Sequence, residues 1–84
     1  MLKLQFSSKT EKFLKKCDNV LSKRIIDKIQ QLEKDPVPHD SKRVVNEEST
    51  FRIRIGNYRV LYKIKYNEKV ILISKIDKRP SVYN

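Results

Sequence analysis

Apolar and polar residues alternate strictly through residues 51–55, which read Phe-Arg-Ile-Arg-Ile. A period of two is typical of a β-strand that buries one face. Gly56, the only glycine of the chain, follows at once and precedes an asparagine, a pair suited to a tight hairpin turn. The pattern therefore predicts a β-hairpin that continues with a second strand over residues 58–64.

Two further strands are predicted near the ends of the chain. Residues 2–6 alternate as Leu-Lys-Leu-Gln-Phe, whereas residues 70–73 are wholly aliphatic and open a strand that runs to residue 76. Because both faces of that last strand are apolar, we expect it to lie in the interior of the sheet. Residues 40–49 are mostly polar and are predicted to form a loop with at most a short extended piece.

The stretch between the first strand and the hairpin has a helical period. Ser8 and Glu11 have the spacing of a capping box, which predicts a helix from Ser8 to about residue 16. Apolar side chains recur at helical spacing over residues 21–32, and Asp18 or Asn19 is suited to cap this second helix. The prolines that follow end it, so we expect the two helices to form a hairpin.

The predicted order is therefore β-α-α-β-β-β, an α+β fold in which a helical hairpin covers one face of a mostly antiparallel sheet. The 84 residues are expected to form a single domain with a thin core. Arg52, Arg54 and Arg59 would share the opposite face, with no acidic side chain close to them. Such a face is either a phosphate-binding surface or the ordinary solvated side of an antiparallel sheet.

The charge of the chain is strongly positive, with 20 basic against 10 acidic side chains and a net charge of +10. Residues 41–84 hold 11 basic and 4 acidic side chains, against 9 and 6 in residues 1–40. This balance indicates a polyanionic partner: nucleic acid first, an acidic protein second and a membrane surface third. The anion-binding side is expected mostly on the C-terminal half.

Cysteine and histidine occur once each, as Cys17 and His39, so neither a disulfide framework nor a zinc site is expected. Cys17 is interpreted as a small buried hydrophobe. The N-terminal residues lack the apolar stretch of a signal peptide, and the aliphatic run at residues 70–73 is far shorter than a membrane span. We therefore expect a cytoplasmic protein without a membrane partner.

The sequence has no Ser-His-Asp set, no phosphate loop and no cluster of metal ligands. Arginine and tyrosine side chains are therefore the remaining candidates for catalytic groups. RNA cleavage can run on such groups, since the 2′-hydroxyl of RNA attacks the adjacent phosphate. Arginine stabilises the developing charge but cannot act as a base. Tyr83, beside Lys78 and Arg79, is the candidate base; alternatively, its ring only anchors the C-terminus on the sheet.

Three stretches of the chain, taken together, resemble those of a known family: Arg52-Ile-Arg54, Gly56-Asn-Tyr58-Arg59-Val-Leu-Tyr62 and Lys78-Arg79-x-x-Val82-Tyr83. The sequence resembles the RelE branch of the RelE/ParE superfamily of toxin–antitoxin toxins over almost its whole length. The resemblance implies an mRNA interferase that needs no metal or other cofactor and cuts mRNA in the ribosomal A site. It also implies a cognate RelB-like antitoxin, acidic and partly disordered when free.

The resemblance also implies roles for single residues. Arg59 would stabilise the charge of the phosphorane, and Arg79 would bind phosphate or protonate the leaving oxygen. Tyr83 would orient or deprotonate the 2′-hydroxyl. These three are the predicted catalytic residues.

The predicted RNA-binding residues are Arg52, Arg54 and Lys78. Arg52 and Arg54 match positions that are lysines in the best-known RelE members. An arginine keeps the positive charge there but removes any role as a base that a lysine could fill.

Two other functions stay open on the same fold. One is a ParE-like toxin that inhibits DNA gyrase without being an enzyme. ParE-type chains typically lack the full set of arginines and tyrosine, which argues against this branch. The other is a degenerate toxin that only binds its antitoxin.

Overall fold

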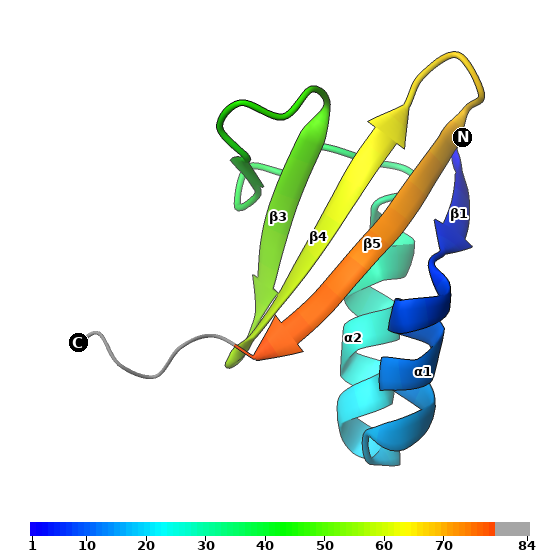
Figure 1. Cartoon of the computed structure of the whole chain (residues 1–84), viewed down its shortest axis with the longest axis vertical. Helices are drawn as coiled ribbons and strands as arrows, with labels where there is room; N and C mark the ends of the chain where they lie inside the picture. The colour runs from blue at the N-terminus through cyan, green and yellow to red at the C-terminus, as the bar shows by residue number, and fades with distance from the viewer. Residues whose placement is uncertain (79–84) are drawn as a thin grey trace.

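The computed structural model describes residues 1–78, which form two helices and a five-stranded sheet (Figure 1). The side chains of both helices pack on the same core, so both helices cover one face of the sheet. The α+β prediction is thereby confirmed. The elements are β1 (Lys3–Phe6), α1 (Ser8–Lys16), α2 (Asn19–Gln31), β2 (Lys42–Arg43), β3 (Thr50–Ile55), β4 (Tyr58–Lys65) and β5 (Val70–Lys78).

The strands are ordered β1-β5-β4-β3-β2 across the sheet. β1 pairs with β5 in parallel, and the other three pairs are antiparallel. β5 has a neighbour on each side, in agreement with the interior position that its apolar faces predicted. β2 is the short extended piece expected within residues 40–49, and it covers only the first part of β3.

The first helix covers the predicted residues 8–16, but its N-cap lies one residue before the Ser8 of the predicted capping box, so that capping assignment is wrong. Ser7 is the N-cap, and its hydroxyl accepts a hydrogen bond from the backbone N–H of Thr10 at 3.2 Å. The backbone N–H of Ser7 donates to the carbonyl of Ile73 on β5 at 3.0 Å. This contact holds Ser7 where β1 ends, and its hydroxyl therefore meets the helix start. Asp18 caps α2 as predicted, accepting from the N–H of Leu21 at 3.0 Å.

The core lies between the helices and the inner face of the sheet. Ile25 and Ile29 of α2 are completely shielded from solvent, as are Val60 of β4 and Ile73 of β5. Each such side chain contributes about 1.5–3 kcal/mol by leaving water. Within residues 1–78, no helix covers the other face of β3, β4 and β5 (Figure 1).

The hairpin turn forms where the sequence predicted it. Gly56 has φ +58°, a conformation that costs little only without a Cβ. The turn sets β4 against β3 in the register Arg54↔Arg59. The positions of all arginines on these two strands follow from that register.

Candidate anion-binding site on the uncovered face of the sheet

The uncovered face carries the three strand arginines on two neighbouring strands. Arg52 and Arg54 alternate with buried Ile53 on β3, and Arg59 precedes buried Val60 on β4. Because side chains alternate between faces, the three arginines leave the sheet on the side away from the helices. The predicted shared face is thus confirmed for the backbone positions of Arg52, Arg54 and Arg59.

A shallow hollow of about 370 Å³ lies on this face, over the middle strands and beside β2. Most of its polar wall is cationic, and two of its cations, Arg52 and Arg59, are predicted site residues. Such a concave, basic surface can hold an anion of the size of a phosphate group. The hollow is lined by Arg43, Val44, Val45, Arg52, Arg59, Leu61, Lys75 and Asp77.

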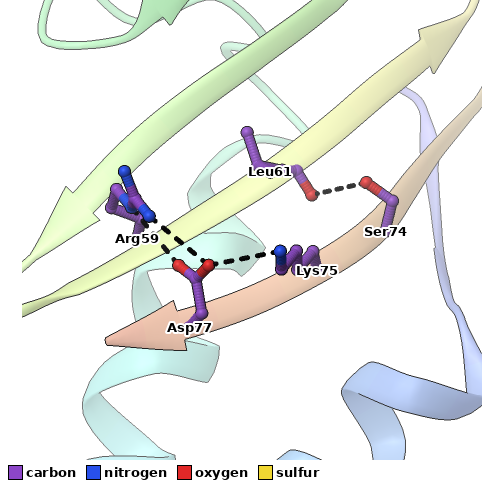
Figure 2. A network of polar contacts seen from close by, with 5 residues as sticks. All are labelled: Arg59, Leu61, Ser74, Lys75 and Asp77. Carbon is purple, nitrogen blue, oxygen red and sulfur yellow. Dashed lines mark hydrogen bonds and ion pairs between the residues drawn. The ribbon is translucent and has the colours of Figure 1, made fainter. Parts of the chain in front are cut away.

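One acidic side chain, Asp77, belongs to the same hollow, so the expectation that no acid lies near the arginines is wrong. Its two oxygens accept from Arg59, with Nε–Oδ1 at 3.3 Å and Nη2–Oδ2 at 3.4 Å (Figure 2). The ammonium of Lys75 lies 3.5 Å from Oδ2. The carboxylate therefore offsets part of the repulsion between the cations of the two strands.

A β-bulge in β5 explains why Asp77 reaches this face. The register with β4 passes from Tyr62↔Ile73 to Leu61↔Lys75, which leaves Ser74 as an extra residue. The Ser74 hydroxyl donates to the carbonyl of Leu61 at 3.1 Å and so bonds the bulge to β4 (Figure 2). One extra residue exchanges the faces of all that follow. Asp77 therefore lies opposite Arg59, whereas a regular strand would turn it toward the core.

Arg54 does not join Arg52 and Arg59 in the hollow. It lines a separate depression with Arg24, Asp27 and Lys28 of α2. β2 pairs with β3 only at positions 51 and 52, so the edge of β3 is open beside Arg54. The structure therefore divides the predicted arginine set into two places.

Lys78 is also separate from the hollow. It pairs with Tyr58, whose ring packs edge-on against Phe13 of α1 with centroids 5.8 Å apart. This position belongs to the helix side of the sheet, because the bulge has exchanged the faces of β5. The remaining predicted catalytic residues, Arg79 and Tyr83, lie outside the described residues.

Three charged residues of the hollow, Arg43, Lys75 and Asp77, are not among the predicted site residues. The alternation of Lys75 and Asp77 around apolar Ile76 could have shown that β5 continues past residue 76. Nothing in the sequence signals the bulge that selects their face. Arg43 lies in the segment predicted to be mostly loop, and only its pairing with Phe51 brings it to the site.

No metal centre is formed within residues 1–78, where no three His, Cys, Asp or Glu side chains gather to hold an ion. Cys17 is half-buried at the C-cap of α1, and its Sγ lies 3.6 Å from the carbonyl oxygen of Leu14. Cys17 was predicted to be a small buried hydrophobe, and the structure buries it only in part. None of the described helices has the length and apolar character needed to cross a membrane.

Comparison with known proteins gives a consistent result. A family model described as the ParE toxin of the type II toxin–antitoxin system parDE matches residues 4–83. A curated relative from Methanocaldococcus jannaschii, which carries the name RelE1, is 33% identical over 64 residues, covering 73% of this chain and 71% of the relative. 

Solved structures share the fold. The isolated E. coli RelE toxin superimposes with a TM-score of 0.87 at 15% identity, over 98% of this chain and 88% of that one. The RelE of an archaeal RelE–RelB complex from Pyrococcus horikoshii OT3 has a TM-score of 0.81 at 24% identity, over 96% and 98% of the two chains.

Proposed function

Because the chain belongs to the ParE toxin family of type II toxin–antitoxin systems, as a toxin of the RelE type, we propose that it is an RNA endonuclease acting on mRNA in the ribosomal A site. The observation that most supports this activity is the hollow in which Arg52 and Arg59 line one space. A phosphodiester placed there would meet guanidinium groups from two strands. Arginine is suited to this task because its planar fork matches phosphate oxygens.

The proposed reaction uses a nucleophile from the substrate. The 2′-hydroxyl oxygen bonds to the adjacent phosphorus while its proton passes to a base, and the bond from phosphorus to the 5′-oxygen breaks. The 5′-oxygen takes up a proton, leaving a 2′,3′-cyclic phosphate and a 5′-hydroxyl end. No metal ion is required for this route, because the attacking group is already part of the RNA.

Arg59 is proposed to stabilise the negative charge that builds on the non-bridging oxygens, the step in which fixed donors contribute most. Tyr83 is proposed to orient or deprotonate the 2′-hydroxyl, and Arg79 to bind phosphate or protonate the leaving oxygen. These two assignments follow from the family resemblance.

The RNA-binding residues receive separate positions in this proposal. Arg52 would hold the phosphate in the hollow beside Arg59, and Arg54 would contact a neighbouring phosphate together with Arg24. Lys78 would reach RNA only from the helix side of the sheet, since it lies opposite Tyr58.

A cognate RelB-like antitoxin is proposed as the neutralising partner. Structures of relatives from Pyrococcus horikoshii OT3 and Mycobacterium tuberculosis are toxin–antitoxin complexes. A domain with net charge +10 and a thin core is suited to an acidic segment that folds on its surface. Binding of such a segment would also raise the stability of the toxin by mass action.

The test is in vitro translation with mapping of mRNA 5′ ends. We expect new 5′ ends at A-site codons with the parent chain and their loss with Tyr83→Phe, while RNA affinity is retained. Cleavage by Tyr83→Phe at the parental rate would contradict the role of the tyrosine.

Gyrase inhibition is a second candidate, because the family model that matches is described as a ParE toxin. A DNA supercoiling assay with the same preparation separates the two functions. Blocked supercoiling together with intact mRNA would replace the nuclease proposal. A chain inactive in both assays that still binds its antitoxin would be a degenerate toxin.

A further inference from the structure

We propose that Asp77 is a positioning residue that holds the guanidinium of Arg59 in the orientation needed to receive a phosphate. This inference rests on the proposed nuclease function and adds a residue to its site. Asp77 contacts Nε and Nη2, the side edge of the guanidinium (Figure 2).

The contact leaves the far end of Arg59 available. Within residues 1–78, Nη1 makes no hydrogen bond, so the two terminal nitrogens can still offer donors to a second anion. One guanidinium can therefore bind the carboxylate by its side and a phosphate by its end. Arg59 would then need little rearrangement when RNA arrives, and this preorganisation raises the rate of reaction.

The fold sets the face of Asp77 through contacts made at Ser74. The bulge at Ser74 turns Asp77 outward, and the Ser74 hydroxyl bonds the bulge to Leu61. The Ser74 carbonyl in turn accepts from the Ser7 hydroxyl at 3.2 Å. An ordinary solvated face would not need this arrangement, because a carboxylate on the surface can approach an arginine from many directions.

A simple counter-charge predicts a different outcome from a positioning group. If Asp77 only neutralised the basic hollow, its removal would strengthen RNA binding and leave cleavage unchanged or faster. If it positions Arg59, its removal should leave binding equal or tighter while cleavage slows. The rate of cleavage therefore distinguishes the two roles, because only a positioning role predicts slower cleavage.

The experiment compares the full-length parent chain with Asp77→Asn, which removes the charge at nearly constant shape. Asp35→Asn is the matched control, because Asp35 is exposed, does not line the hollow and makes no ion pair among residues 1–78. Affinity is measured by fluorescence anisotropy with a short single-stranded RNA, and cleavage by single-turnover assays on ribosomes programmed with mRNA. Thermal unfolding confirms that each variant folds.

We expect Asp77→Asn to bind RNA at least as tightly as the parent and to cleave at least about tenfold more slowly at saturating toxin. Asp35→Asn should match the parent. Cleavage by Asp77→Asn at or above the parental rate would overturn the positioning role.

A second measurement keeps this inference separate from the proposed function. In ¹⁵N spectra of the arginine side chains, the Arg59 Nε–H signal should exchange slowly with water in the parent and rapidly in Asp77→Asn. If the parent does not cleave mRNA, the nuclease proposal fails. The exchange rate of the Arg59 Nε–H signal then still tests whether Asp77 holds the Arg59 guanidinium. Rapid exchange already in the parent would refute the positioning of Arg59.

Discussion

On the inner face of the sheet, Ile53, Val60 and Ile73 are buried beneath the helices. On the outer face, Arg52 and Arg59 line an open hollow. Inner side chains need mainly the right size and an apolar surface. Outer side chains act through charge and hydrogen-bond direction, so their effect depends on which groups lie opposite them. Substitutions on the inner face should therefore lower stability, and those on the outer face should lower activity.

The largest expected effect on stability is at Ile73, which is fully buried in β5. Ile73→Ala should lower the free energy of unfolding by about 2–5 kcal/mol, because it removes packed methyl groups and leaves a cavity. Leu72 precedes it on the opposite face and is only half-buried, so Leu72→Ala should cost about 1 kcal/mol or less. Urea unfolding measures both; equal losses would show that the two faces do not differ as described.

The largest expected effect on activity is at Arg59. Arg59→Ala should reduce A-site cleavage by about 100- to 1,000-fold, the loss typical when a donor to a developing oxyanion is removed. Its half-exposed ion pair with Asp77 contributes about 1 kcal/mol or less to stability. Lys63→Ala is the control on the same strand and face, because Lys63 does not line the hollow. Mapping of mRNA 5′ ends compares the two; similar activities would remove the catalytic role of Arg59.

An intermediate effect is expected at Tyr62, a polar group on the inner face. Its hydroxyl donates to the carbonyl of Pro36 at 2.7 Å, so Tyr62→Phe should cost about 1 kcal/mol at neutral pH. Burial raises the pKa of Tyr62 from 10.0 to about 12.

This pKa shift makes the effect of Tyr62→Phe depend on pH. A raised pKa means that the folded state retains the proton more strongly, so the stabilisation is complete below pH 10 and is lost as pH rises through about 12. The parent should therefore lose stability relative to Tyr62→Phe across this window. Urea unfolding at several pH values tests this, with Tyr66→Phe as control because Tyr66 is exposed. A stability difference that does not change with pH would contradict the shift.

The smallest effects are expected for the two predicted RNA-binding arginines, Arg52 and Arg54. They test whether the two depressions that these residues line act separately. Arg52→Ala and Arg54→Ala should each lower the salt dependence of RNA binding by about 0.7 log units per log unit of salt, the loss of one phosphate contact. Only Arg52→Ala should also slow cleavage of bound RNA, because only Arg52 shares the hollow with Arg59. Equal cleavage by both variants would show that the two depressions act as one site.

Much of the fold was predictable because its signals are local. The alternation at residues 51–55, the turn at Gly56 and the apolar stripe of α2 each depend on neighbouring residues, and the structure agrees with all three. The N-cap of α1 was misplaced by one residue, because the contact between Ser7 and Ile73 decides it across a long sequence separation.

The site was predictable only in part. Alternation correctly placed Arg52, Arg54 and Arg59 on one face, yet it could not show that Arg54 lines a different depression. It also could not place Asp77, since its face depends on a bulge whose partner, Leu61, lies on another strand.

The sequence by itself determined which side chains are apolar, where the chain turns and that the protein carries a large positive charge, because these properties belong to single residues and their near neighbours. Only the tertiary structure decided which charges meet. The physical reason is register: one unpaired residue at Ser74 exchanges the faces of the rest of β5, and it brings Asp77 to Arg59 instead of the core.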